Sequence, residues 1–514
     1  MFDFKGLVGA LFSKRDQEGV FDLKSATVMM QELPESDILQ AQLEIVKALK
    51  QLNANPKISL KERMKTVPYL DEKARTLQQH LVDIYLGRVI VEHVGPPHVL
   101  PTLLAFWAEM GDAYRITLKQ AQQTSNRPLD KSMHIFILRG LAYFGQQIKW
   151  AYLRYLELDP KVWRNLNRLY LLAEQQGCAN TPLQAYPDSE ITESRREYLQ
   201  VLMLALANPE RLQSSQIEVL SQWLKRWAGR IDLETQIRPN RQLFAINIAG
   251  STPPKRLRRD MVGENWRYWT TEPLVQHMRE VAEQLMQDEV DPAAHGLPED
   301  SAAPANIDLI QGLIELWSRD TPAPIRKFER RTAKKAIHVV RGLDDVIQFL
   351  RGERTGSSTA RSPALSGRWE VENESAGGVG VTYQSAGDDK LQAGEILGLS
   401  GIGNQPFATG IVRRINKTLD GLVHVGIEVL TQTAVIVELS PLGSDRSFFG
   451  LYSPDATANP RGRFLLLPQA FFADSREFRL SAQGKIYRIR LSTALEHTAR
   501  ATLTRFAVLE KLGG

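Results

Sequence analysis

The chain has 514 residues, 43% of them hydrophobic and 24% charged, with a net charge of +5 and a single cysteine, Cys178. This length exceeds what one hydrophobic core normally supports, so we expect several domains. One cysteine excludes a disulfide framework within the chain and suits a reducing compartment, so we expect a cytoplasmic protein. No run approaches the about 18 apolar residues of a membrane span. The small positive charge does not by itself indicate nucleic-acid binding.

The first half of the chain has the periodicity of amphipathic helices. Apolar side chains recur at steps of three and four between residues 36 and 56, and again between 74 and 87. A polar residue followed by proline interrupts the pattern at Asp159-Pro160 and at Asn208-Pro209, which is typical of helical hairpins. These breaks are 49 residues apart, whereas a tetratricopeptide repeat has about 34. We therefore expect an irregular stack of helical hairpins over residues 1–235, which would serve as a docking surface.

Residues 236–320 have a mixed pattern. Alternating apolar residues within 241–257 predict a strand or a hairpin. Helices are expected at 266–287 and 307–320, and the stretch 288–306 between them, rich in Pro, Ala and acids, is expected to be a linker or long loop.

The helical period disappears after residue 321. Short β-branched runs bounded by glycine and polar turns predict a small all-β barrel or sandwich over 321–444. Strand-like alternation continues over 445–514, either as part of that barrel or as a second β module. The predicted fold class is multidomain α + β, with an N-terminal helical-hairpin bundle, an antiparallel β-barrel and a further C-terminal β-rich segment.

Familiar catalytic motifs are absent from the sequence. There is no HExxH, no pair of CxxC motifs and no P-loop lysine motif, and the carboxylates are scattered. His93 and His98 have no third ligand close in sequence, so we interpret them as ordinary loop histidines. The sequence therefore predicts a protein that is not an enzyme and has neither a cofactor nor a metal.

Two segments stand out for their chemistry. Residues 326–341, which we call the basic leader, hold seven Lys or Arg against one acid and end in a predicted strand. The sequence Asn373-Glu374-Ser375-Ala376-Gly377-Gly378, which we call the corner, begins 38 positions after Lys335 and lies between two runs of strand-like alternation. A basic run alone is usually a solvated surface, and the corner alone could be any β-turn.

Together the two segments resemble the PilZ family of bacterial cyclic di-GMP receptors. That family has an RxxxR stretch leading into the first strand and a later (D/N)xSxxG on a turn of the barrel. Asn373, Ser375 and Gly378 match the second motif in full. Arg331 fits the first arginine of RxxxR, but a lysine stands at 335 in place of the second.

The resemblance covers about residues 326–440 and implies a PilZ-like antiparallel barrel whose last strand is 422–430. It also implies a cyclic di-GMP site formed by Arg326, Arg330, Arg331, Lys335, Asn373, Ser375, Gly377 and Gly378. The segment 326–330 satisfies RxxxR as well, in a register further from the strand. Lysine lacks the planar fork with which arginine reads guanine and stacks on it. Two interpretations therefore stay open: a working nucleotide site, or a degenerate barrel that serves as a scaffold.

The resemblance implies an effector that binds cyclic di-GMP. It does not cover the helical region, but the stack of helical hairpins is expected to contact an unidentified protein partner, and the single cysteine suits the cytoplasm. The alternative is an adaptor whose barrel binds no nucleotide. A binder of nucleic-acid polymers is the least favoured function, because the basic leader contains only one aromatic residue, Phe328.

Overall fold

The computed structural model describes the chain except for residues 1–19, 21, 35, 125–128, 239, 288–290, 322–327, 356–367, 386–389, 402–406, 445, 455–460, 499 and 514. It contains two compact units. The first comprises Met1–Ala207 and Glu218–His277, and the second comprises Asn208–Ile217 and Met278–Gly514. The first unit is mainly helical and the second is mainly β, which confirms the predicted α + β class.

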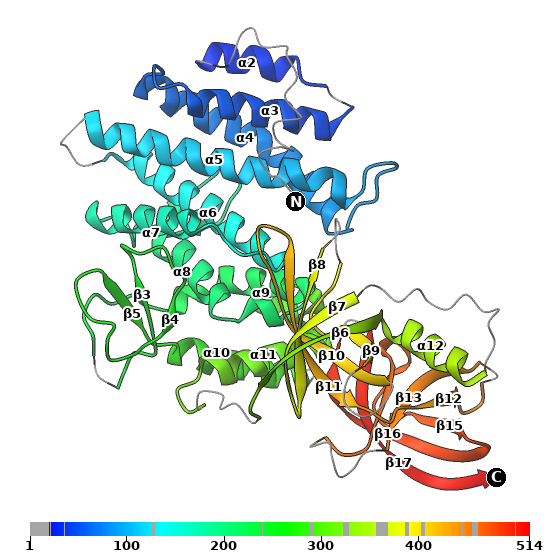
Figure 1. Ribbon diagram of the computed structural model, residues 1–514. Coiled ribbons are helices and arrows are strands. Elements are labelled where there is room, and N and C mark those ends of the chain that lie inside the picture. The colour runs from blue at the N-terminus through cyan, green and yellow to red at the C-terminus, as the bar shows by residue number, and fades with distance from the viewer. Residues whose placement is uncertain are drawn as a thin grey trace. The chain divides into compact units, whose positions relative to one another are not determined.

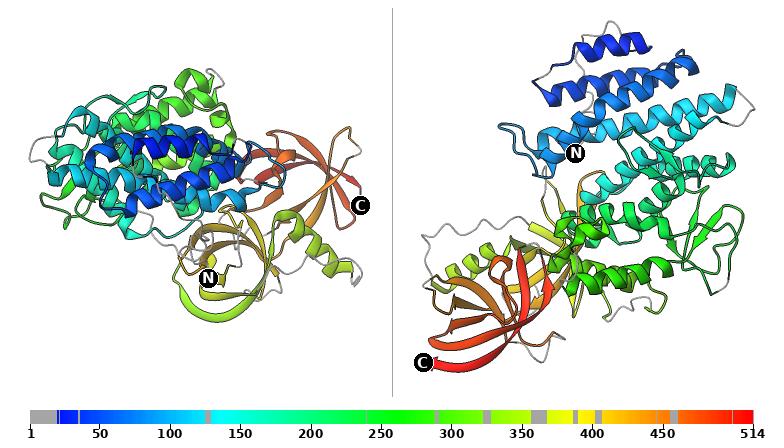
Figure 2. Two further views of the ribbon diagram at one scale, coloured as in Figure 1. Left: turned by 90° about the horizontal axis from the view of Figure 1, so that it is seen from above. Right: turned by 180° about the vertical axis from the view of Figure 1, so that it is seen from behind.

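Helices of the first unit stack one after another along the sequence (Figure 1; Figure 2, right). They are α2 (Leu23–Gln31), α3 (Ile38–Ala54), α4 (Leu60–Tyr85), α5 (Pro96–Thr124), α6 (Lys131–Leu153), α7 (Pro160–Gln175) and α8 (Ser194–Ala205). The chain passes between the two units at three points: between Ala207 and Asn208, within α9 (Ser214–Trp227) and within α10 (Glu272–Met286). In the described part of the chain, no helix combines the length and the apolar character that a membrane crossing requires.

The predicted hairpin breaks are confirmed. The Asp159 side chain accepts a hydrogen bond from the amide of Lys161, and Pro160 occupies the first position of α7, where no amide is needed. Asn208 has a left-handed backbone, with φ of 54°, before a single 3-10 turn that precedes α9. Asp159 therefore begins α7, and Asn208 turns the chain between the end of α8 and the start of α9.

A three-stranded sheet lies between α9 and α10 in the sequence. Its order is β4 (Lys255–Arg256), β3 (Phe244–Asn247) and β5 (Trp266–Trp269), which confirms the hairpin expected at 241–257. The helix expected at 266–287 begins only at Glu272, because the preceding aromatic residues pair with β3. A two-stranded ladder of β1 (Leu183–Gln184) and β2 (Ile191–Thr192) precedes α8.

The second unit contains α11 (Pro304–Trp317) and a closed six-stranded barrel. The barrel strands are β6 (Arg331–Arg341), β7 (Arg368–Ser375), β8 (Gly378–Gln384), β9 (Ile396–Ser400), β10 (Phe407–Lys417) and β11 (Leu422–Thr431). They close in the order β6-β7-β8-β11-β10-β9, and every neighbouring pair is antiparallel. The predicted barrel and its last strand are confirmed.

A second closed barrel follows within the same unit. Its strands are β12 (Val435–Pro441), β13 (Phe448–Ser453), β14 (Phe464–Pro468), β15 (Glu477–Ala482), β16 (Lys485–His497) and β17 (Ala501–Gly513). They close in the order β12-β13-β14-β17-β16-β15. Of the two alternatives for the C-terminal segment, the structure therefore has a second β module, and its first strand starts at Val435. Domain boundaries at 235, 320 and 444 stay predictions.

The expectation that the helical pattern ends at residue 321 is wrong. Between β6 and β7 lies α12 (Leu343–Thr355), whose buried Leu343, Val346 and Ile347 follow the helical period. These side chains belong to one hydrophobic core with Phe407 and Ile411 of the first barrel and with buried residues of the second barrel. The helix was overlooked because its 13 residues stand among strand-like runs and lead into a Ser- and Gly-rich stretch.

Candidate functional site

The corner closes the hairpin between β7 and β8. Ser375 and Gly378 lie opposite each other in the ladder, so Ala376 and Gly377 form a two-residue turn. Ser375 Oγ donates a hydrogen bond to the carbonyl oxygen of Gly378 at 3.2 Å. This hydrogen bond stabilises the turn, and the lone pairs of the Ser375 hydroxyl oxygen can still accept hydrogen bonds.

Asn373 lies against the neighbouring strand at a β-bulge. A register shift after Val371 places Asn373 opposite Gly380. A Cβ at position 380 would lie 2.8 Å from Asn373 Nδ2 and 2.9 Å from Oδ1, so a larger residue there would have to displace the amide. Asn373 Oδ1 is buried and accepts no hydrogen bond within the described part of the chain. A buried acceptor without a donor carries a free-energy penalty, which an incoming N–H group would relieve.

The two glycines of the corner bring it into contact with β11. A Cβ on Gly378 would collide with the carbonyl oxygen of Ile427. The amide of Val429 donates a hydrogen bond to the carbonyl oxygen of Gly377 at 3.2 Å. Glu428 lies directly opposite Gly378 in the ladder. Glycine at 378 is therefore required by the close approach of β11.

The basic leader runs beside the corner where the structure describes it. In the antiparallel pair β6–β7, Arg331 lies opposite Glu374 and Thr332 lies opposite Asn373. The ring of Phe328 is 44% exposed and covers Gly377, since two of its carbons would be 2.9 Å from a Cβ there. The structure thus brings together the two segments that the sequence singled out.

Seven of the eight residues predicted for the site are described, and Arg326 lies outside the described residues. Arg330 and Arg331 are exposed at the start of β6. Lys335 follows a bulge and lies opposite Val371, further along the ladder than the corner. Its Nζ nevertheless reaches Glu374 Oε2 at 2.7 Å.

The ion pair of Lys335 with Glu374 changes the electrostatics of the site. Both side chains are more than a third exposed, at 36% and 42%, so the pair contributes only about 0–1 kcal/mol to stability. The pair nevertheless neutralises the charge of Lys335, which stands where the PilZ family has an arginine. An anion entering the corner must therefore compete with a carboxylate. Sequence reasoning missed Glu374 because it occupies a variable position of the motif.

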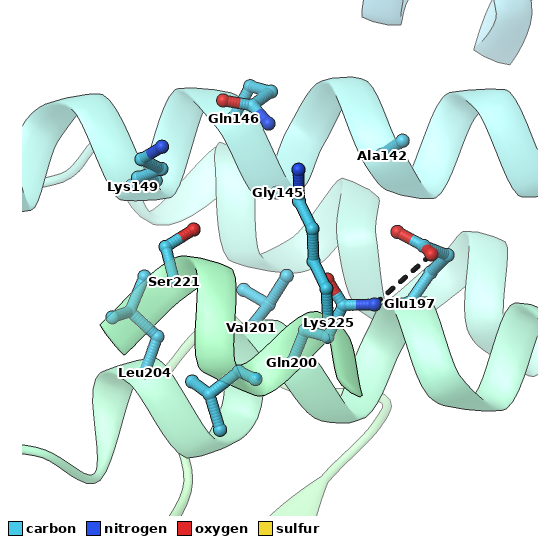
Figure 3. A pocket seen from close by; sticks show the side chains of 11 residues that line it. Ala142, Gly145, Gln146, Lys149, Glu197, Gln200, Val201, Leu204, Ser221 and Lys225 are labelled. Carbon is cyan, nitrogen blue, oxygen red and sulfur yellow. Dashed lines mark hydrogen bonds between the residues drawn. The ribbon is translucent and has the colours of Figure 1, made fainter. Parts of the chain in front are cut away.

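The helical unit contains a small polar pocket between α6, α8 and α9 (Figure 3). Its volume is about 60 Å³, and Lys149, Glu197 and Lys225 are among the lining residues. Gln200 donates a hydrogen bond to Glu197 at 3.1 Å, and burial raises the pKa of Glu197. A volume of this size holds a few water molecules.

A buried carboxylate, Asp71, stands at the centre of a second polar cluster in the helical unit. It accepts hydrogen bonds from the hydroxyls of Tyr114, Tyr143 and Tyr186, and Arg139 Nη1 lies 3.5 Å away. Burial raises the pKa of Asp71, although these donors act in the opposite direction. The cluster ties the segment before α8 to α4, α5 and α6, which is a structural role. The described residues contain no group of three His, Cys, Asp or Glu side chains placed to hold a metal ion.

Comparisons with known proteins find a PilZ domain in the chain. A family model for the N-terminal domain of the cyclic-di-GMP receptor FimW matches residues 24–239. A model for the middle PilZ domain of that receptor matches residues 353–435, which include the corner but not the basic leader. The chain is 19% identical over 529 aligned positions to the cyclic-di-GMP receptor FimW of Pseudomonas aeruginosa, and the alignment covers 88% of this chain and 85% of the relative.

Proposed function

We propose that this chain, which contains a PilZ domain, is an effector that binds cyclic di-GMP between its basic leader and its corner. One observation carries the proposal: exposed Arg330 and Arg331 lie beside a corner that has Asn373, Ser375 and Gly378 in place. The similarity to a protein named as a cyclic-di-GMP receptor supports it.

The ligand has two phosphates and two guanines, and the site offers a partner for each kind of group. A guanidinium can pair with the O6/N7 edge of guanine, stack on its face or clamp a phosphate. Asn373 Oδ1 is a buried acceptor that a guanine N–H group would satisfy. The glycines allow close approach to the backbone of the turn. In this proposal, Arg330 and Arg331 fold over a ligand that rests on the corner.

Calorimetry on the purified full chain tests the proposal. We expect a heat of binding with cyclic di-GMP and a rise in melting temperature, because a ligand that prefers the folded state stabilises it. Ser375→Ala should weaken binding by about tenfold, since it removes a hydroxyl that both fastens the turn and faces the ligand. Absence of both heat and thermal shift at high ligand concentration would refute nucleotide binding.

A second function, that of an adaptor with a silent barrel, is favoured by the ion pair of Lys335 with Glu374. Lys335→Arg separates the two functions, because arginine restores the planar fork. Tighter binding than in the parent protein supports a working site. No binding in the parent and none in the variant supports the adaptor.

We further propose that the effector is not an enzyme, acts in the cytoplasm and relays the nucleotide level to a protein partner through its helical unit. Stacked helical hairpins commonly present docking surfaces, and the sequence lacks familiar catalytic motifs. Co-purification from cells with high and low cyclic di-GMP tests the relay. We expect at least one protein whose recovery changes with the nucleotide, and the change should disappear with Arg331→Ala. Identical recovery in all samples would contradict the relay.

A further inference from the structure

The two barrels of the second unit have the same strand order. When the strands of each barrel are numbered 1 to 6 in chain order, both barrels close in the order 1-2-3-6-5-4. All neighbouring pairs are antiparallel in both barrels. Each strand of the first barrel therefore has a counterpart six strands later, and so does each connection.

The second barrel lacks both segments of the proposed nucleotide site. The counterpart of the corner is the connection between β13 and β14, where the sequence reads Pro-Asp-Ala-Thr-Ala-Asn-Pro-Arg-Gly-Arg over residues 454–463. Pro460 follows Thr457 at the spacing by which Gly378 follows Ser375, and proline has no backbone N–H to offer a ligand. Residues 431–434, which precede β12, contain no Lys or Arg.

The counterpart connection instead makes ion pairs with the first barrel. Arg461 Nη2 lies 3.2 Å from Glu428 on β11, and Arg461 Nη1 lies 2.8 Å from Glu496 on β16. Arg413 of β10 binds the same two carboxylates, with Nε 2.7 Å from Glu428 and Nη2 2.8 Å from Glu496. The four side chains, which we call the Arg-Glu ring, are between 22% and 34% exposed, so solvent screens them only in part.

The Arg-Glu ring is attached to the corner through β11. Glu428, one of its members, lies opposite Gly378, and the next residue, Val429, donates its amide to Gly377. A register shift in β10 between Val412 and Arg414 marks the position from which Arg413 joins the ring. The two arginines therefore hold the side chain of the residue on which the corner rests and neutralise its charge.

We infer that the second barrel is a duplicate of the first that binds no nucleotide, and that Arg461 of its corner-like connection positions the nucleotide-binding corner of the first barrel through Glu428. The inference rests on the proposed function for its ligand. The part played by Arg461 in holding the corner is independent of any ligand. Loss of Arg461 would leave Arg413 as the partner that the ring provides for the Glu428 carboxylate, so more of its negative charge would act on a site for a dianion, and β11 would loosen behind the corner.

Arg461→Ala tests the inference in the full chain, with Arg463→Ala as the matched control. Arg463 belongs to the same connection and is exposed. We expect Arg461→Ala to weaken cyclic di-GMP binding about fivefold, in the range for residues of one ion-pair network, and Arg463→Ala to leave it unchanged. Arg461→Lys should restore part of the affinity because it keeps the charge. Equal affinities of Arg461→Ala and Arg463→Ala, with the parent protein binding normally, would overturn the inference and leave the proposed function standing.

Hydrogen exchange of peptides that contain Val429, measured without nucleotide, gives a second readout. Arg461→Ala should speed exchange of this amide several-fold, whereas Arg463→Ala should not. Glu496→Gln provides the same test with a smaller change, should Arg461→Ala fold poorly. Exchange of the Val429 amide that is unaltered in both Arg461→Ala and Glu496→Gln would contradict the positioning role of Arg461. Slower exchange at the connection between β13 and β14 on adding cyclic di-GMP would contradict the assignment of the second barrel as silent.

Discussion

The two barrels of the second unit share one strand order but differ at one connection. Between β7 and β8, a short turn with glycines at 377 and 378 faces an arginine-bearing strand. Between β13 and β14, the corresponding connection is longer, has proline at 460 and directs Arg461 to a neighbouring barrel. The barrel thus supplies a frame, and in the proposed function the side chains at one connection decide whether that frame binds a ligand or another barrel.

The largest effect should come from Arg331→Ala. A good bidentate contact to guanine contributes about 1–3 kcal/mol, so we expect cyclic di-GMP affinity to fall by about ten- to a hundredfold. Arg368→Ala is the control, because Arg368 is exposed at the far end of β7. Calorimetry measures both. Equal affinities for the two variants would show that the basic leader takes no part in binding.

Gly378→Ala should follow in size. Its methyl group would meet the carbonyl oxygen of Ile427, and overpacking of this kind costs about 1–3 kcal/mol. We expect a lower melting temperature and about tenfold weaker nucleotide binding. In the second barrel, Gly484→Ala on the turn between β15 and β16 has open space around it but a left-handed φ of 79°, so it should lower stability without changing affinity. A nucleotide affinity that falls equally in both variants would show that the two barrels do not differ in their effect on binding.

Glu374→Gln should have the opposite sign. Removing this carboxylate releases Lys335 from its ion pair and takes a negative charge out of the corner, so we expect cyclic di-GMP to bind about three- to fivefold more tightly. Glu372→Gln serves as the control, since Glu372 pairs with His424, at 3.3 Å. Competition titration at fixed ionic strength resolves such a difference. Unchanged or weaker binding in Glu374→Gln would show that the pair does not oppose the ligand.

The smallest effect concerns pH. Burial alone would raise the pKa of Glu496, but hydrogen bonds and positive charge from Arg413 and Arg461 outweigh it and lower the pKa below its ordinary value of 4.5. A carboxylate of this kind stabilises the fold above the pKa of the unfolded chain and loses that contribution as pH falls through the lower, folded value. Urea denaturation should therefore show that the free energy of unfolding of the second unit falls below about pH 4.5. It should fall less in the Glu496→Gln variant. Parallel pH profiles of the two proteins would contradict a role for the Arg-Glu ring.

Local signals in the sequence predicted the domain and singled out the two segments of the candidate site. The PilZ domain was expected from the leader and from the corner at Asn373, and the match of the family model confirms it. Hairpin breaks at proline and alternation in the barrel strands were also readable, because they depend on neighbours in sequence. The placement of Phe328 over Gly377 and the pairing of Lys335 with Glu374 depend on the register of β6 against β7, which two bulged strands set.

Contacts between distant strands could not be predicted from the sequence. The two barrels share their strand order, which depends on pairing between strands that are distant in sequence. They have no common sequence motif at the corner that would have revealed this. Glu428 and Arg461 are 33 positions apart in strands and connections of different barrels, and nothing in their local sequence marks them as partners. α12 was missed for another reason: its helical period is short and stands inside a region of strand-like runs.

Hydrogen exchange of the full chain with and without cyclic di-GMP reports on both barrels in one experiment, so it can separate a nucleotide-binding barrel from a silent one. We expect slower exchange on adding nucleotide in two segments of the first barrel, residues 328–335 and 371–380. We expect no slowing at the counterpart positions of the second barrel, residues 431–435 and 454–463. Protection at the connection of the second barrel, or no protection at the corner of the first, would show that the two barrels do not divide these roles.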